Sequence, residues 1–247
     1  MMGPIGLELR RRPDTMASLL AQTPTATAGW ILEIIGTEGI GKTTLNNALA
    51  GKLRKTWFLR HSLEQFGPAA DGDPELEALH RDIYLHMVDK VTQEETDPWK
   101  TITLLRQKGR VISESLTIQT HPFPRGFVLD EGLCKGFPRE VLDLASGSPD
   151  PLWHKRAFVY LRADDIEVAL RRYQGRVQKR DERGLPISIP TDAHVLERLR
   201  EQTDLYDRII DTATAFGCPT VTIKAEAPLK TCKAQFLEFE RGIREGV

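Results

Sequence analysis

The sequence predicts an α/β fold in which a parallel sheet is flanked by helices on both faces. Short apolar runs rich in β-branched and aromatic residues alternate along the chain with segments whose apolar residues recur at helical spacing. A glycine-rich stretch, GTEGIGKT (residues 36–43), stands directly between the first such run and the first such segment. Strands that alternate with helices pair in parallel, because each helix carries the chain back across the sheet.

Length and composition fit one domain behind an N-terminal arm. The chain has 247 residues, of which 40% are hydrophobic and 28% are charged, which is enough for a sizeable core. Its 34 basic and 35 acidic residues give a net charge of −1, so no global attraction to nucleic acid or to an anionic membrane is expected. Residues 1–29 are rich in Thr, Ala, Pro and Arg and predict a mobile arm, which leaves residues 30–247 as the folded domain.

Cysteine usage and the lack of a long apolar run predict a cytoplasmic protein. Cys134, Cys218 and Cys232 are few, odd in number and without metal-type spacing, as expected of reduced thiols. No run approaches the roughly 18 apolar residues that a membrane span needs. No apolar segment of the secretory type follows the basic residues near the N-terminus either.

The first half of the chain gives the first elements. WILEII (30–35) predicts a buried strand, and KTTLNNALAGKLRK (42–55) predicts a helix with one buried stripe of leucines. TWFLR (56–60) is compatible with a second strand. Asp73 and Pro74 have the pattern of a helix N-cap and first turn, and mostly helical sequence follows to about residue 120, with breaks predicted near ETDPWK and Gly109.

The second half continues the alternation. Further strands are predicted at RGFVLDEG (125–132), RAFVYLRAD (156–164) and PTVTIKA (219–225). Helices are predicted to begin after Asp164 or Asp165, at a cap formed by Thr191 or Asp192, and at the start of LKTCKAQFLEFERGI. Gly217 marks the end of the second of these helices.

The stretch 36–43 fits G-x-x-x-x-G-K-[ST] without a mismatch and predicts a P-loop. Its glycines let the chain turn back at the end of a strand, so that backbone amides and the positive end of the next helix form a nest for phosphate oxygens. Lys42 adds an ammonium that reaches β- and γ-oxygens of a nucleoside triphosphate, and the Thr43 hydroxyl can ligate Mg²⁺. The residues expected to bind the nucleotide are Gly36, Glu38, Gly39, Ile40, Gly41, Lys42, Thr43 and Thr44.

The run FVLDEG carries the next candidate residues. Asp130 ends four apolar positions, as does the acidic residue that supports Mg²⁺ across from a P-loop. Glu131 follows it, and an apolar run ending in Asp-Glu is typical of ATPases in which the glutamate orients water. Many nucleotide kinases carry an arginine at that position instead. This stretch by itself therefore favours hydrolysis.

A basic segment favours transfer to an acceptor. The stretch ALRRYQGRVQKRDERG (169–184) holds six cations within 13 residues: Arg171, Arg172, Arg176, Lys179, Arg180 and Arg183. A phosphoryl transition state spreads charge over its equatorial oxygens, and mobile guanidinium groups that close over it stabilise that charge. We therefore predict a basic lid at about residues 171–190, with a solvated helix face as the alternative.

In this order, the motifs resemble the thymidylate kinase and deoxynucleoside kinase branch of P-loop kinases over roughly residues 30–240. The resemblance rests on GTEGIGKTT, on FVLDEG, on VYLRADDIEVALRR leading into GRVQKRDERG, and on LREQTDLYDRII before TVTIKA. It implies that Lys42 and the loop amides hold the phosphates of ATP, with Thr43 on Mg²⁺ and Asp130 between metal and acceptor. It further implies that Arg176 and Arg180 approach from the lid, and that adenine lies between the lid base and residues 225–228.

Two departures from the resemblance fall on the acceptor side. After the second strand, thymidylate kinases carry Arg-Glu-Pro and deoxynucleoside kinases carry Glu-Pro, whereas FLRHSLEQFGP has neither; Arg60 and Glu64 are loose counterparts. Glu131 and Gly132 stand where those families have an arginine after the acidic strand. The donor site therefore carries over, while the identity of the acceptor does not.

The sequence thus predicts an ATP- and Mg²⁺-dependent phosphotransferase that moves the γ-phosphate to a nucleoside or nucleoside monophosphate. The expected catalytic residues are Lys42, Asp130, Glu131, Arg176 and Arg180, and the expected metal ligands are Thr43 and Asp130. The alternatives are an ATPase in which Glu131 orients water and drives a change in a partner or nucleic acid, and a kinase for an unusual acceptor such as a modified base in DNA.

A small molecule is the expected partner. Nucleic acid stays open but is not indicated by the net charge, a homodimer is compatible with the sequence, and no membrane is expected.

Overall fold

A five-stranded sheet forms the centre of the computed structural model, which describes residues 20–59, 63, 69–70, 72–145, 151–181 and 191–246. The strands are β1 (Ile31–Ile35), β2 (Trp57–Leu59), β3 (Gly126–Leu129), β4 (Arg156–Arg162) and β5 (Thr220–Lys224). Their order in the sheet is β2-β3-β1-β4-β5, and every pair is parallel. The predicted parallel α/β fold is confirmed.

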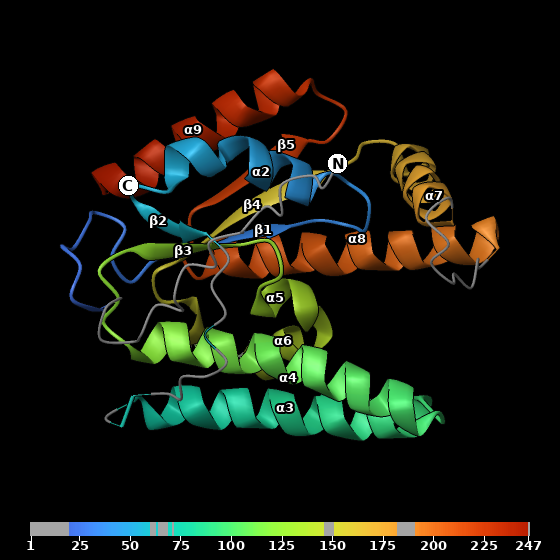
Figure 1. The fold of residues 1–247 in the computed structure, drawn as a ribbon, viewed down its shortest axis with the longest axis horizontal. Helices are drawn as coiled ribbons and strands as arrows, with labels where there is room; N and C mark the ends of the chain where they lie inside the picture. Colours follow the sequence, from blue (N-terminus) through green and yellow to red (C-terminus); the bar gives the residue numbers. More distant parts are fainter. Residues whose placement is uncertain are drawn as a thin grey trace, which may run out of the picture.

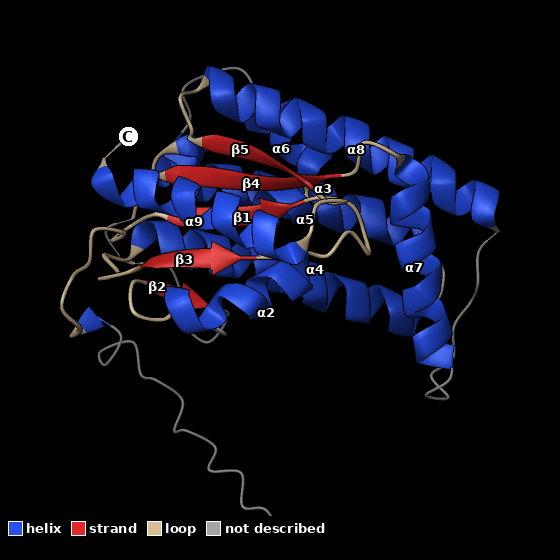
Figure 2. Ribbon diagram, turned by 90° about the horizontal axis from the view of Figure 1, so that it is seen from above, coloured by secondary structure: helices blue, strands red, loops and turns tan. Residues whose placement is uncertain are grey.

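Helices cover both faces of the sheet (Figure 1). α2 (Lys42–Leu53) and α9 (Leu229–Glu245) lie on one face. The other face carries α3 (Pro74–Glu94), α4 (Pro98–Thr120), α5 (Leu133–Gly136), α6 (Pro138–Ala145) and α8 (Asp192–Ala215). α7 (Ile166–Asp181) stands at one end of the molecule, beyond the strands (Figure 2). Among the described residues, no helix is long and apolar enough to cross a membrane.

The alternation of side chains along β1 explains why the sheet is buried on both faces. Leu32 and Ile34 point to the core beneath α2 and α9, whereas Ile31 and Ile35 belong to cores on the opposite face. All five residues of β1 are buried. One of these, Glu33, is charged.

Most helix ends follow the predicted signals. The Asp73 carboxylate accepts hydrogen bonds from two backbone amides in the first turn of α3, and Pro74 occupies the first helical position, as predicted. The predicted break near ETDPWK is real, because α3 ends at Glu94 and α4 begins at Pro98. The predicted break at Gly109 is wrong. Gly109 lies inside α4, where a Cβ would stand 3.4 Å from the Tyr84 ring of α3, an ordinary contact distance.

The end of the predicted N-terminal arm packs on the domain. Thr27 is fully buried, and its hydroxyl accepts a hydrogen bond from the Gly126 amide and donates one to the Thr56 carbonyl. The Thr25 amide donates to the carbonyl of Pro124 over 2.7 Å. A boundary at residue 29 is therefore too late for these threonines, which tie the chain to the amino ends of β2 and β3. Residues 1–19 of the arm lie outside the described part of the chain.

Candidate active site

The pairing register brings the predicted site residues to one edge of the sheet. Glu33 of β1 pairs with Leu129 of β3 and with Phe158 of β4. Because the strands are parallel, the loop after β1, the residues after β3 and the connection from β4 to α7 all leave the sheet on the same side (Figure 2). This edge therefore gathers the P-loop, Asp130 and the base of the basic segment.

The P-loop backbone requires its three glycines. Gly36, Gly39 and Gly41 have φ angles of 141°, 76° and 115°, a region that residues with a Cβ rarely adopt. A Cβ on Gly36 would also stand 2.4 Å from the Leu161 carbonyl oxygen of β4. The loop therefore lies directly on β4, and its conformation depends on the glycines of the motif.

Lys42 is folded back onto this loop. Its ammonium donates hydrogen bonds to the Gly36 carbonyl over 2.5 Å and to the Thr37 carbonyl over 2.7 Å, and the residue is 8% exposed. Burial, helped by the nearby Lys135 ammonium, lowers its pKa from 10.5 to about 7, while Glu38 and Asp130 oppose the shift. The charge of Lys42 is thus sensitive to any anion that enters the loop.

Thr43 and Asp130 lie together at the start of α2. The Thr43 hydroxyl donates to the Asp130 carboxylate over 3.3 Å. A hydroxyl and a carboxylate are the oxygen donors that Mg²⁺ prefers, so the pair fits this cation in chemistry. No group of three or more His, Cys, Asp and Glu side chains among the described residues could hold a metal. Such a cation would accordingly take its other ligands from phosphate oxygens and water, which is common for Mg²⁺.

Glu131 is turned toward two cations from neighbouring helices. Its carboxylate oxygens lie 3.6 Å from an Arg110 nitrogen of α4 and 3.9 Å from the Lys135 ammonium of α5. Its side chain is 58% exposed, so these pairs are screened by water and contribute little to stability.

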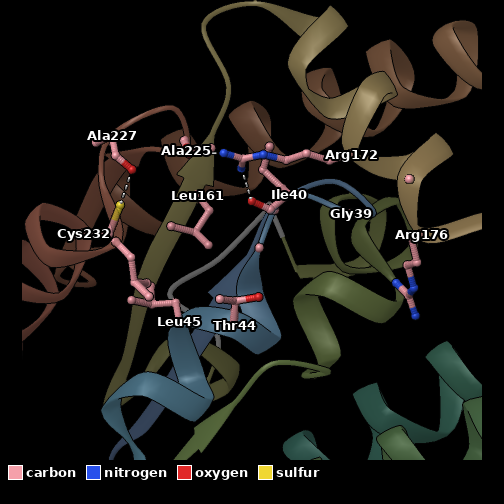
Figure 3. A pocket seen from close by; sticks show the side chains of 13 residues that line it. Gly39, Ile40, Thr44, Leu45, Leu161, Arg172, Arg176, Ala225, Ala227 and Cys232 are labelled. Carbon is pink, nitrogen blue, oxygen red and sulfur yellow. Dashed lines mark hydrogen bonds between the residues drawn. The ribbon is translucent and has the colours of Figure 1, made fainter. Parts of the chain in front are cut away.

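Two arginines of the basic segment have different contacts: Arg172 binds backbone carbonyls, and Arg176 lines a cavity. Arg172 of α7 donates to the Ile40 carbonyl over 2.7 Å and to the Ala225 carbonyl over 2.9 Å, and so joins the P-loop to the end of β5. Arg176, one turn later, lines the cavity beside the loop and is close enough to lower the pKa of Lys42 (Figure 3). Arg171 lies 3.9 Å from Asp165 on the exposed side of the helix.

The rest of the predicted lid is only partly described. Residues 182–190 lie outside the described part of the chain, as does the side chain of Arg180, so its predicted role stays a prediction. The loose counterparts Arg60 and Glu64 also lie outside it.

A cavity of about 850 Å³ opens between the P-loop, α7 and the segment after β5 (Figure 3). The side of this cavity away from the loop is apolar, with Leu161, Ala225 and Ala227 among its lining residues. The resemblance to P-loop kinases predicts adenine in this region, between the base of the lid and residues 225–228. Its volume and apolar lining are those of a typical small-molecule site.

A second cavity, of about 750 Å³, lies on the other side of the P-loop. Its walls come from the loop at Glu38, from α4, and from the segment between β3 and α6 that includes Glu131. Four cations line it: Arg106, Lys108, Arg110 and Lys135. Trp99, which is 76% exposed, adds an aromatic surface to the wall.

Sequence reasoning missed several of these residues. In the sequence Arg172 is one of six cations in the basic segment. Its hydrogen bonds to the Ile40 and Ala225 carbonyls join two distant segments, which no sequence pattern indicates. Arg110 and Lys135 belong to no motif. Lys135 lies four residues after Glu131, whereas Arg110 reaches Glu131 only through the packing of α4.

Comparison with known proteins gives similarity of fold. No family model matches the sequence, and no curated protein matches it. A solved structure of deoxyadenosine kinase from M. mycoides with bound dATP is 15% identical, with a TM-score of 0.46 over 86% of this chain and 99% of that chain. The structure of that kinase with bound dCTP is 16% identical, with a TM-score of 0.45 over the same shares.

Proposed function

We propose that the protein is an ATP- and Mg²⁺-dependent phosphotransferase whose acceptor is a nucleoside or nucleoside monophosphate. The observation that carries the proposal is the pair of cavities on opposite sides of the P-loop. One cavity is mostly apolar and ends at the loop glycines, which suits a nucleotide base and its ribose. The other is lined by cations, a carboxylate and an aromatic ring, which suits a second small molecule that carries a hydroxyl or phosphate.

On the donor side, the loop amides and Lys42 bind the phosphates of ATP, and Arg176 adds positive charge from α7. Thr43 and Asp130 would hold Mg²⁺, which would neutralise charge on the phosphates. The pair of carbonyls that now holds Lys42 releases its ammonium to the β- and γ-oxygens. The positions of the side chains around the loop support these roles.

On the acceptor side, an oxygen of the bound molecule attacks the γ-phosphorus, and the bond from that phosphorus to the β–γ bridging oxygen breaks. ADP leaves, and the proton of an acceptor hydroxyl passes to a carboxylate. We assign the role of proton acceptor to Glu131, because it lines the second cavity. Arg110 and Lys135 orient it there and bind anionic groups of the acceptor.

The ATPase alternative keeps one observation in its favour, the Asp130-Glu131 pair at the end of an apolar strand. In such ATPases the glutamate orients water at the γ-phosphate. Here its carboxylate is engaged by cations of α4 and α5, within a cavity large enough for a nucleoside. We therefore favour transfer to an acceptor.

The test is an acceptor screen with γ-labelled ATP, in which transfer and hydrolysis are read separately. Ribo- and deoxynucleosides and their monophosphates are offered singly, with and without Mg²⁺. We expect label on at least one of them, and no label with Lys42→Met, which lacks the ammonium. If no acceptor is labelled, while Glu131→Gln traps bound ATP and stops hydrolysis, the protein is an ATPase and the proposal fails.

A further inference from the structure

Glu33 is a charged residue inside the central strand of the sheet. Its side chain is fully buried, and it forms an ion pair with Arg156 of β4, which is also fully buried. Buried ion pairs are weak evidence for stability, since apolar replacements of similar volume are often neutral or stabilising. The position of this pair therefore calls for a reason beyond holding the sheet together.

The Glu33 carboxylate contacts the loop that follows β3. One of its oxygens accepts a hydrogen bond from the Cys134 amide over 3.2 Å, in the first turn of α5. The N-cap residue of α5, Gly132, has no side chain to cap the helix, so Glu33 supplies the acceptor from a neighbouring strand. The carboxylate thus fixes the start of α5.

Gly132 is required by the presence of Glu33. Its φ and ψ angles are −88° and −179°, an extended conformation open to any residue. A Cβ at this position would stand 2.3 Å from the carboxyl carbon of Glu33. Residue 132 must therefore be a glycine because the Glu33 carboxylate leaves no room for a side chain there. The carboxylate lies directly against the loop.

Glu33 consequently holds both ends of the acidic loop. Its backbone pairs in register with Leu129, directly before Asp130. Its side chain lies against Gly132, directly after Glu131, and accepts a hydrogen bond from the Cys134 amide two residues later. Arg156 is itself held by the Leu152 carbonyl and the Gln119 side chain, which orients the carboxylate.

We propose that Glu33 is a positioning residue that sets where Asp130 and Glu131 stand relative to the P-loop. The assignment deepens the proposed function, on which it rests, by naming what holds the Mg²⁺-supporting carboxylate in place. It acts through the loop and does not touch the substrate.

The test removes the buried pair without leaving a lone charge. In Glu33→Leu/Arg156→Met the core stays apolar, so we expect a folded protein. The response to Mg²⁺ should weaken, with half-saturation raised at least about tenfold, the scale on which outer-shell partners of metal ligands act. Calorimetry of ATP binding with and without Mg²⁺ gives this readout even if no acceptor is found, so failure of the proposed function is recognised separately.

Glu240→Gln is the matched control. Glu240 is also a buried carboxylate, but it belongs to α9, where it accepts a hydrogen bond from the Trp57 indole and pairs with Arg244. Its replacement should lower thermal stability and leave the Mg²⁺ response unchanged. Gly132→Ala is the second variant, since it presses on the Glu33 carboxylate and keeps the ion pair. The proposal is overturned if Glu33→Leu/Arg156→Met or Gly132→Ala folds normally and its Mg²⁺ response is unchanged.

Discussion

Lys42 is buried, and its ammonium lies against the backbone of the P-loop. Its ammonium donates to the Gly36 and Thr37 carbonyls, and burial brings its pKa to about 7. A bound triphosphate adds negative charge beside it and raises that pKa. The protonation of one side chain is therefore coupled to nucleotide binding.

We predict that ATP binding takes up a proton at pH 8. The free protein then carries a largely neutral Lys42, and the complex carries a charged one, so affinity falls as the pH rises above about 7. Titration calorimetry in two buffers of different ionisation enthalpy measures the uptake. Lys42→Arg is the control, because arginine stays charged and should take up no proton. Equal uptake in both proteins would place the titrating group elsewhere.

We also predict that Asp130→Asn slows transfer by at least about 10²-fold, the typical scale for losing one charge-stabilising group. The amide keeps the size of the side chain and can still accept the Thr43 hydroxyl, so the local fold should persist. A Mg²⁺ titration of activity checks the cause. Asp82→Asn, on the exposed surface of α3, is the control with no expected effect. A normal Mg²⁺ response in Asp130→Asn would show that the acid has another role.

At the scale of an element, α7 is both a wall of the cavity beside the P-loop and the start of the predicted lid. Its base is fixed by Arg172, which joins carbonyls of the P-loop and of the end of β5. Its Tyr173 backbone lies close enough to Gly39 that a Cβ there would stand 3.1 Å from the Tyr173 nitrogen. Any movement of the lid is therefore expected beyond this anchored turn.

Arg172 and Arg176 form a matched pair for testing this division. Arg172→Ala removes the clamp, so it should loosen α7, raise proteolysis within it and weaken ATP binding. Arg176→Ala should leave the fold and ATP affinity nearly unchanged and reduce transfer severely, because its contacts tighten in the transition state. Limited proteolysis and single-turnover transfer measure the two effects. The same phenotype in both variants would contradict separate roles.

At the scale of the whole molecule, a buried polar network ties the helical layer to the sheet. His80 of α3 is 1% exposed and contacts the Leu76 carbonyl and the Ser115 hydroxyl. Ser115 donates to Gln119, whose side chain accepts from Arg156 of β4. Burial lowers the pKa of His80 from 6.5 to about 4, so the folded protein holds it neutral.

This network makes stability depend on pH. The unfolded chain protonates His80 as the pH falls below about 6.5, while the folded protein does so only near 4, so stability is lost across that window. The shift corresponds to about 3 kcal/mol when complete. Urea denaturation at pH 7 and pH 5 should show roughly 2 kcal/mol of loss from this residue. His80→Gln should flatten the dependence, and an equal slope in both proteins would contradict it.

The parts of the site that the sequence predicted are all marked by patterns within a short stretch of the chain. The P-loop is a contiguous motif between a strand and a helix, and Asp130 follows directly on an apolar strand, so both could be placed before the structure was known. Arg110 and Glu33 could not be placed with respect to Asp130 and Glu131. Their roles arise from packing between segments far apart in the chain, for which no spacing rule exists. Lys135 lies only four residues after Glu131, but its approach depends on the turn of α5, which the sequence did not predict. α5 and α6 were missed for a related reason, since each is too short to show a helical period.

The order of strands in the sheet also governs how the protein is made. Ile31, at the start of the central strand, pairs with Phe127 and Arg156, so both of its neighbours are translated long after it. Until then the nascent chain carries an apolar strand with two unpaired edges, of the kind that associates with other chains. The P-loop rests on Leu161, so it cannot close before residue 161 has left the ribosome. A nucleotide therefore has no formed P-loop to bind during the early steps of synthesis, while residues 31–35 still lack both partner strands.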